Sequence, residues 1–138
     1  MQTKPEKIVA EMMAKDTFSQ WLGIEILDVK EGFAKIKMTV RKEMLNGHSV
    51  AHGGISFSLA DSAFAFASNS HGQKAVSIET SINHIKPIFE GDQLIATAEK
   101  ESISKSLGQY IVRVHRGDEL VGLFKGVVFR KQDEWDVG

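Results

Sequence analysis

The chain has 138 residues, 42% of them hydrophobic, which is enough for one ordinary domain whose core needs no disulfides. Its net charge is −1 and its basic residues are scattered, which argues against a protein that binds nucleic acids or anionic membranes. The absence of cysteine excludes disulfides, zinc–thiolate sites and cysteine nucleophiles.

The sequence contains no segment typical of targeting or of membrane insertion. Its first residues lack the apolar core of a signal peptide, and no stretch reaches the roughly 18 consecutive apolar residues of a membrane span. We therefore expect a single domain over residues 1–138 of a soluble, cytoplasmic protein.

The N-terminal segment, residues 1–22, has the pattern of an amphipathic helix over residues 5–21. Pro5 suits the first turn, and Gly23 is placed to end the helix. Apolar residues gather on one side of it: Ile8, Val9, Met12, Met13 and Phe18.

Two alternating segments follow, residues 24–29 and 33–40, and the sequence Lys30-Glu31-Gly32 between them signals a hairpin turn. In the second segment one face is apolar, with Ala34, Ile36, Met38 and Val40, and the other carries Lys35, Lys37 and Thr39. This pattern predicts a half-exposed antiparallel pair.

The central stretch, residues 46–69, begins as a loop rich in glycine and small polar residues. After Gly53-Gly54 it becomes an apolar run long enough for four turns of helix. Asp61 is its only acidic residue. Burying an ionised carboxylate in so apolar a helix costs free energy, and aspartate favours helix caps over helix interiors. The sequence therefore places a charge where folding alone would not.

At 100° per residue, small and polar residues share one narrow stripe of this helix: Gly54, Ser58, Asp61, Ala65 and Ser68. A second face is apolar, with Ile55, Leu59, Ala63 and Phe66, and Phe57 and Phe64 flank the Asp61 side. We expect a helix buried nearly all round, with room beside Asp61 for a group that is not protein.

The apolar period is two in the rest of the chain, which predicts strands over residues 76–83, 94–103, 110–114 and 120–130. Residues 131–138 are polar and are expected to fray. Two strands, a long helix and four strands predict an α+β fold in which a single antiparallel sheet of about six strands wraps the helix. The sheet edges and the remaining apolar surface predict symmetric pairing with a second copy.

The start of the central helix has the features of a catalytic site. Free amides and the positive end of the helix dipole gather at Gly53 and Gly54, where they can polarise a carbonyl oxygen that becomes an oxyanion. Asp61, two turns further on, can act as a general base on water or as a nucleophile. The alternative is a structural role, with the glycines as a helix start and Asp61 as a buried cap or ion-pair partner.

A metal site is not expected. His48 and His52 are four residues apart, but they lie in a glycine-containing loop with no third ligand nearby. We expect His52 to position the loop by hydrogen bonding. The other histidines have the pattern of surface or satisfied strand residues: His71, His84 and His115.

Three motifs resemble the signature of the PaaI-type hotdog-fold acyl-CoA thioesterases, a family associated with phenylacetic acid degradation: Asn46-Gly47-His48, His52-Gly53-Gly54 and Ser58-Leu59-Ala60-Asp61. The resemblance extends over most of the chain. It implies a hotdog fold, dimers with one continuous sheet and active sites at the subunit interface, and often a tetramer. It also implies hydrolysis of a thioester to an acid and coenzyme A (CoA), without a cofactor because CoA is part of the substrate.

The resemblance assigns Asp61 the role of base or nucleophile and the Gly53 amide the role of oxyanion donor. Asn46, from the partner subunit, would orient the attacking water or the thioester. Ser77 matches a polar position that some relatives use to hold water. His52 and Gly54 are expected to lie beside the substrate.

Substrate binding adds further candidates. The CoA phosphates would bind basic side chains, for which the candidates are Lys86, Lys100, Lys105 and Arg113. An aromatic or medium-chain acyl group would bind an apolar pocket, for which the candidates are Phe57, Phe64 and Phe66. Taken singly, the basic residues also suit solvated strand ends, and the aromatic residues also suit the core.

The leading hypothesis is a thioesterase for phenylacetyl-CoA, hydroxylated phenylacetyl-CoA or related aryl or medium-chain acyl-CoA esters. An acyl-thioester dehydratase on the same fold would carry Pro-Gly before the helix, where this chain has Gly-Gly. A non-catalytic acyl-CoA-binding module is the other alternative, and the intact set of Asn46, Gly53 and Asp61 argues against it.

Overall fold

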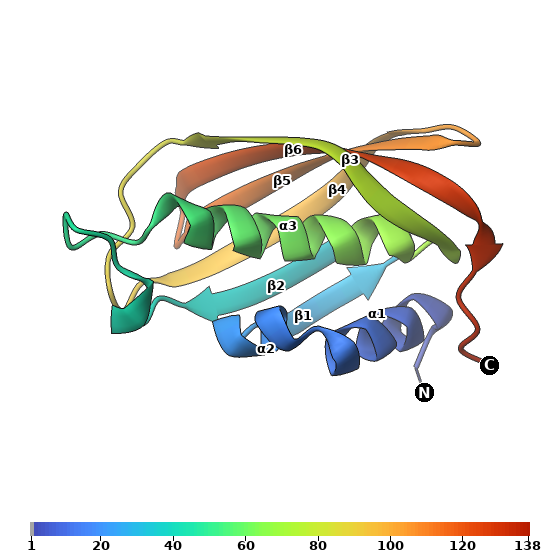
Figure 1. Ribbon diagram of the computed structural model, residues 1–138, viewed down its shortest axis with the longest axis horizontal. Coiled ribbons are helices and arrows are strands. Elements are labelled where there is room, and N and C mark those ends of the chain that lie inside the picture. Colours follow the sequence, from blue (N-terminus) through green and yellow to red (C-terminus); the bar gives the residue numbers. More distant parts are fainter. Residues whose placement is uncertain (1) are drawn as a thin grey trace.

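A computed structural model describes residues 2–138 as one antiparallel sheet curved around a long helix (Figure 1). The elements in chain order are α1 (Lys4–Lys15), α2 (Thr17–Leu22), β1 (Glu25–Lys30), β2 (Phe33–Thr39), the 3-10 helix η1 (Lys42–Met44), α3 (Gly53–Asn69), β3 (Gln73–His84), β4 (Gln93–Ile103), β5 (Leu107–Arg116) and β6 (Glu119–Glu134). The strand order is β1-β2-β4-β5-β6-β3, and all neighbours are antiparallel. The predicted α+β class, the six strands and the central helix are confirmed.

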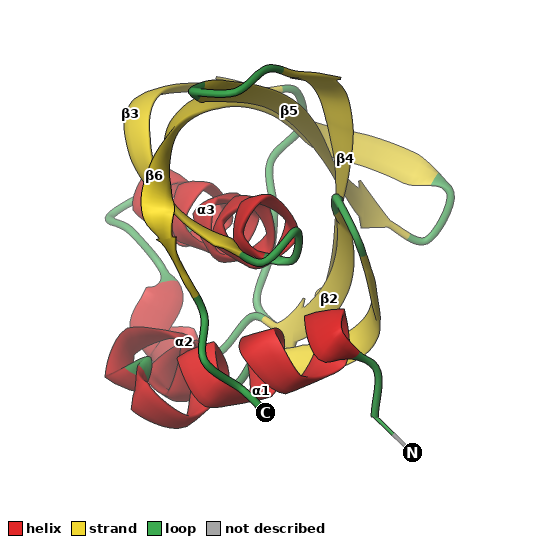
Figure 2. Cartoon of the chain, turned by 90° about the vertical axis from the view of Figure 1, so that its right-hand side faces the viewer, coloured by secondary structure: helices red, strands yellow, loops and turns green. Residues whose placement is uncertain are grey.

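The inner face of the sheet packs on α3 through small and apolar side chains. In β2, Ala34, Ile36 and Met38 face α3 and are at most 1% exposed, whereas the lysines between them are half-buried on the outer face. Seen along α3, the sheet passes over the helix, and α1 and α2 lie below it (Figure 2). The hairpin alternation predicted from the sequence therefore sets which face of the sheet meets the helix.

The closest approach of α3 to the sheet lies at Gly126 in β6. A Cβ atom added to Gly126 would lie 2.6 Å from Cζ of Phe64, a distance that real side chains do not adopt. The Phe64 ring also packs against Tyr110 and Phe124, at centroid distances of 5.8 Å and 5.5 Å. A glycine at this position lets the end of the Phe64 ring approach the backbone of β6 closely.

The N-terminal segment forms two helices rather than the predicted single helix over residues 5–21. The chain turns at Asp16, where φ is −89° and ψ is 82°. The Asp16 carboxylate accepts hydrogen bonds from the Ser19 backbone N–H at 2.9 Å and from Ser19 Oγ at 2.6 Å, so it caps α2. Gly23 ends α2 in a left-handed conformation with φ of 76°, as predicted. The capping preference of aspartate overrides the helical period here.

The C-terminal segment, residues 131–138, was expected to fray, and this expectation is wrong for its first half. Strand β6 continues to Glu134. The Trp135 backbone N–H then donates to the Gly72 carbonyl at 2.8 Å, and Trp135 Nε1 donates to Asn69 Oδ1 at 3.0 Å. The indole thus attaches the tail to the end of α3.

One edge of the sheet is long and open. Strand β3 pairs with β6 on one side only, and its side chains Val76 and Ile78 are 47% and 57% exposed. The other edge strand, β1, has half the length of β3 and packs against α1. An open edge strand with apolar side chains is a surface for pairing with another chain. Symmetric pairing stays a prediction, and β3 is the edge that suits it.

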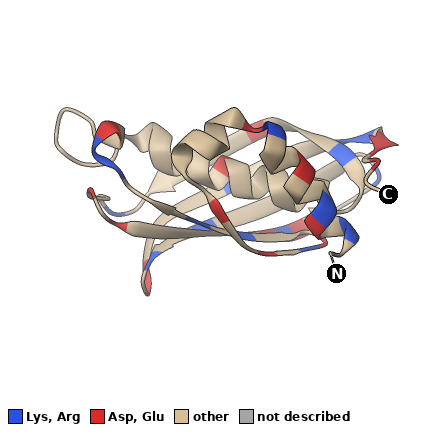
Figure 3. Cartoon of the chain, turned by 90° about the horizontal axis from the view of Figure 1, so that it is seen from below, with Lys and Arg blue, Asp and Glu red and all other residues tan. Residues whose placement is uncertain are grey.

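Charged residues of both signs are intermingled along the strands, the turns and the N-terminal helices (Figure 3). This distribution agrees with the scattered charge seen in the sequence. No helix within residues 2–138 is long and apolar enough to cross a membrane.

Replacing Gly126 with alanine tests the contact between α3 and β6. Because the new methyl group would collide with the Phe64 ring, we expect the free energy of unfolding to fall by about 1–3 kcal/mol in urea titrations. Gly47→Ala is the control, since nothing lies within 4 Å of a Cβ at that position. Its effect should stay within about 0.5 kcal/mol. Equal stability of both variants and the parent would contradict the close approach.

Candidate active site

Asp61 lies at the middle of α3, on the one face of this helix that is not fully buried. The predicted stripe of small and polar residues is this accessible face: Gly54 is exposed and Ser58, Asp61 and Ala65 are half-buried. Only Ser68, at the end of the stripe, is buried. The opposite face of α3 lies in the core, as predicted, with Ile55, Leu59, Ala63 and Phe66.

The Asp61 carboxylate has no ion-pair partner among residues 2–138. Partial burial raises its pKa above the ordinary value of 3.8, and the negative charge of Asp16 raises this pKa further. A carboxylate in these surroundings is a stronger base than one in water. The alternative interpretation of Asp61 as an ion-pair partner is therefore wrong for the residues that the structure describes.

The first turn of α3 leaves one amide free. His52 is the N-cap residue, and its Nδ1 accepts a hydrogen bond from the Gly54 N–H at 2.9 Å. The Gly53 N–H meets no acceptor within the part of the chain that the structure describes. Gly53 is therefore the amide that can donate to a substrate oxygen, and Gly54 is not.

Asn46 shapes the loop before α3. Its Oδ1 accepts hydrogen bonds from the backbone N–H groups of His48 at 2.8 Å and Val50 at 3.4 Å. Further along the loop, the Ala51 N–H donates to the Ile88 carbonyl at 2.7 Å. The two bonds to Asn46 hold the shape of the loop, and the bond from Ala51 joins the loop to the segment between β3 and β4. Within residues 2–138 they leave the Nδ2 group of Asn46 without an acceptor, so it remains available for a substrate or a water molecule.

A cavity of about 270 Å³ opens beside Gly53; we call it the Gly53 cavity. Its walls are Val50, Ala51, Gly53, Ser56 and the segment from His84 to Ile88. A larger hollow, of about 440 Å³, lies on the outer face of the sheet around Glu79 and Lys125, and it contains none of the predicted site residues. The smaller cavity is the one next to the free amide.

His84 is a site neighbour that the sequence did not reveal. Its Nδ1 lies 3.3 Å from Ser56 Oγ, and its Nε2 would lie 3.2 Å from a Cβ on Gly53. The sequence predicted a surface or satisfied strand residue. Only the length and curvature of β3 bring this imidazole to the start of α3, and neither can be deduced from a local pattern.

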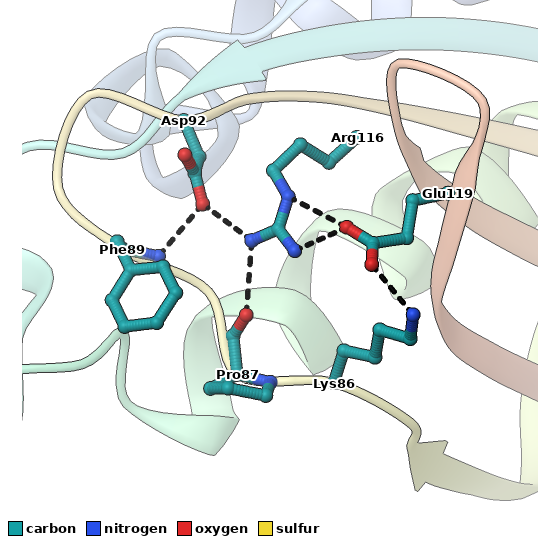
Figure 4. Close-up of polar contacts among 6 residues, drawn as sticks. All are labelled: Lys86, Pro87, Phe89, Asp92, Arg116 and Glu119. Carbon is teal, nitrogen blue, oxygen red and sulfur yellow. Dashed lines mark hydrogen bonds and ion pairs between the residues drawn. The ribbon is translucent and has the colours of Figure 1, made fainter.

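Lys86 lines the Gly53 cavity, but its ammonium group is paired with Glu119 at 2.6 Å (Figure 4). Arg116 also binds Glu119, and it binds Asp92 at 2.8 Å and the Pro87 carbonyl at 3.0 Å. Lys86 and Arg116 together lower the pKa of Glu119 to about 2. In this chain, Lys86 and Arg116 hold the cavity wall in place, and a role in CoA binding stays a prediction.

The remaining candidates are more dispersed. Ser77 is exposed on the edge strand β3, next to a bulge. Phe57 is half-buried, with its ring 5.4 Å from that of Phe124. Lys105 lies in the turn between β4 and β5, at the opposite end of the molecule from the start of α3 (Figure 1). Within one chain, the start of α3 and its cavity therefore contain His52, Gly53, Gly54 and Lys86, whereas Lys105 lies far from them.

The cap on α3 can be tested through stability. His52→Ala removes the acceptor of the Gly54 amide, and we expect the free energy of unfolding to fall by about 1 kcal/mol. His52→Asn supplies another capping side chain, so most of that loss should be recovered. Urea denaturation of the three proteins measures the difference. An equal loss in both variants would show that the hydrogen bond to Gly54 is not what His52 contributes.

Comparison with known proteins agrees with this geometry. The Thioesterase superfamily matches residues 48–123. Acyl-coenzyme A thioesterase PaaI of Escherichia coli is 45% identical over 116 residues, 83% of each chain. The structure of the E. coli PaaI protein from the phenylacetic acid degradation operon has a TM-score of 0.92 and 40% identity, covering 95% of this chain and 96% of that one. A mutant of PaaI from Thermus thermophilus has a TM-score of 0.82 and 38% identity, covering 84% of this chain and 100% of that one. The chain therefore belongs to the thioesterase superfamily, in which it is a PaaI-like hotdog-fold acyl-CoA thioesterase.

Proposed function

We propose that the protein hydrolyses phenylacetyl-CoA, hydroxylated phenylacetyl-CoA or related aryl or medium-chain acyl-CoA esters. The operon from which the E. coli relative is named supports an aryl-acetyl group. Of the three phenylalanines considered for the acyl pocket, only Phe57 is half-buried beside the accessible stripe, whereas Phe64 and Phe66 lie in the core. Phe57 is therefore the aromatic side chain that is placed to meet an acyl group.

The observation that carries the proposal is the unpaired Asp61 carboxylate on the open face of α3. In the proposed reaction the thioester oxygen accepts a hydrogen bond from the Gly53 amide, and Asp61 takes a proton from the water that attacks the carbonyl carbon. The tetrahedral intermediate expels the CoA thiolate, which receives the proton from Asp61. Direct attack by Asp61, followed by hydrolysis of the anhydride, gives the same products. Neither route requires a metal or a cofactor.

The spacing of Gly53 and Asp61 supports an active site between two subunits. An α-helix rises about 1.5 Å per residue, so the two residues are separated by roughly 12 Å along α3. A carbonyl carbon held by the Gly53 amide lies only about 4 Å from that amide. Asp61 of the same chain is thus too distant for direct attack. A two-fold axis that pairs the β3 edges would set the two α3 helices antiparallel, with Gly53 of one chain opposite the partner subunit's Asp61.

The same pairing would extend the six-stranded sheet into one continuous sheet. The exposed side chains of Val76 and Ile78 on β3 support it, because they would be covered in the dimer. We propose that two such dimers form the tetramer that the resemblance implies. The cytoplasmic location and the roles of Ser77 and Asn46 likewise stay predictions.

Asp61→Asn tests the assignment of the base. We expect kcat for phenylacetyl-CoA, followed by thiol release, to fall about 100-fold or more. Because burial raises the pKa of Asp61, ionisation at neutral pH destabilises the fold, so the variant should be at least as stable as the parent in urea. In the parent, kcat/KM should fall as the pH drops through that raised pKa. Asp28→Asn, which removes an exposed carboxylate on β1, is the control. Parental turnover by Asp61→Asn would remove Asp61 from the mechanism.

Mixed dimers test whether the site spans two chains. Gly53→Pro deletes the free amide at the first position of α3, where proline is favoured, and the extended backbone of His52 suits a following proline. We expect Gly53→Pro and Asp61→Asn each to be nearly inactive. After the two are unfolded and refolded together in equal amounts, about a quarter of parental activity should return, because half of the dimers then contain one intact composite site. If Gly53 and Asp61 act within one chain, no activity returns.

A further inference from the structure

The corner between α1 and α2 meets α3 beside Asp61. We infer that Asp16 is a positioning residue for Asp61: it holds α2 against α3 through Ser19 and Ser62, and it places a second negative charge next to the Asp61 carboxylate. This inference deepens the proposed function and rests on it for the role of Asp61. It also explains why the N-terminal segment contains a break that its amphipathic pattern does not predict.

The contact is a chain of buried hydrogen bonds. Ser19 Oγ donates to Asp16 Oδ2 at 2.6 Å and lies 2.8 Å from Ser62 Oγ. Because a serine hydroxyl has one proton and Ser19 gives its proton to the carboxylate, the Ser62 hydroxyl must donate to Ser19. Ser19 and Ser62 are 1% and 8% exposed, so water cannot readily replace either partner. These hydrogen bonds therefore fix the rotation of α3 about its axis at Ser62, the residue that follows Asp61.

Asp16 also stands out electrostatically. Asp61 is the only charged residue of α3, and α2 has none. Strands β2, β4, β5 and β6 face the middle of α3 with uncharged side chains. On the other neighbouring elements, Glu11 pairs with Lys15 and Asp28 pairs with Lys30, while Lys74 lies over the Trp135 ring. The remaining charged residues of α1, β1 and β3 are exposed or half-buried: Lys4, Glu6, Lys7, Glu25 and Glu79. His84 lies at the start of α3, and His71 follows its end. Besides desolvation, Asp16 is what raises the pKa of Asp61.

The consequence for catalysis follows from like-charge repulsion. A nearby carboxylate disfavours the ionised form of Asp61 and so strengthens its affinity for the proton that it takes from water. The same repulsion leaves a smaller fraction of Asp61 ionised in acid. Removing the charge of Asp16 should therefore change the pH dependence of catalysis in a direction that general damage to the fold cannot imitate.

Asp16→Asn removes this charge with little change of shape. Asparagine caps helices as well as aspartate does, so its Oδ1 can keep the hydrogen bond from the Ser19 N–H. Its Nδ2 replaces the acceptor Oδ2 and can donate to Ser19 Oγ, which then donates to Ser62, so the contact is kept with its direction reversed. We expect the acid limb of the kcat/KM profile for phenylacetyl-CoA to move to lower pH, so that the ratio of variant to parent activity rises as the pH falls. Glu11→Gln removes the same charge from α1, and its profile should match that of the parent. A profile of Asp16→Asn that superimposes on the parent's would overturn the inference.

The hydrogen-bond chain has a separate test. Ser62→Ala breaks the chain and keeps the charge, and we expect kcat to fall about 10-fold with KM little changed, because misplacement of a catalytic group lowers the rate more than binding. Ser62→Thr retains the hydroxyl and should recover most of kcat. Equal kcat for Ser62→Ala and the parent would show that the chain does not position Asp61.

Two further variants keep the result decisive. If Asp16→Asn fails to fold, Asp16→Ser replaces it, since serine also caps helices, and the same shift of the acid limb is expected. Asp61→Asn is measured alongside. If it is inactive while the Asp16 variants keep the parental profile, this inference alone fails. If it retains parental turnover, the proposed role of Asp61 fails, and the inference fails with it.

Discussion

Because the sheet does not close around α3, one strip of this helix stays accessible, and the candidate active site lies along that strip. Six adjacent strands about 4.8 Å apart form a sheet roughly 24 Å wide. A circle around the helix axis with a radius of roughly 10 Å has a circumference of about 60 Å, so the sheet can cover only part of it. Helices α1 and α2 cover a second part of this circumference (Figure 2). Only in the uncovered strip can α3 carry a carboxylate without an ion-pair partner, and Asp61 lies there.

The two functional groups of α3 arise from different properties of the same helix. At its start, the geometry of the first turn leaves backbone amides without helical partners. His52 accepts a hydrogen bond from the Gly54 amide, and the Gly53 amide has no acceptor within residues 2–138. At Asp61, the side chain is held in surroundings poor enough in water to raise its pKa. The helix rise of roughly 12 Å separates the two groups, which is why the proposed reaction joins α3 helices from two chains.

Much of the fold could be predicted from periodicity. The hairpin, the central helix and the period of the later strands follow from local patterns, and the proposed roles of Gly53 and Asp61 follow from motifs within one stretch of sequence. The break at Asp16, the docking of Trp135 and the approach of His84 to Gly53 could not be predicted in this way. The contacts of Trp135 and His84 join residues far apart in the chain, so they depend on the final packing, whereas the break at Asp16 depends on a local cap that competes with the helical period of residues 5–21.

In the proposed reaction, Asp61 and the Gly53 amide act on the same carbonyl group. A crystal structure with a ketone analogue of phenylacetyl-CoA, in which a methylene group separates the sulfur from the carbonyl carbon, tests this most directly. We expect a carbonyl oxygen about 2.7–3.1 Å from the Gly53 nitrogen, with the partner subunit's Asp61 facing the carbonyl carbon. A ketone bound away from both groups, or an Asp61 carboxylate paired with a lysine or arginine in the complex, would contradict it.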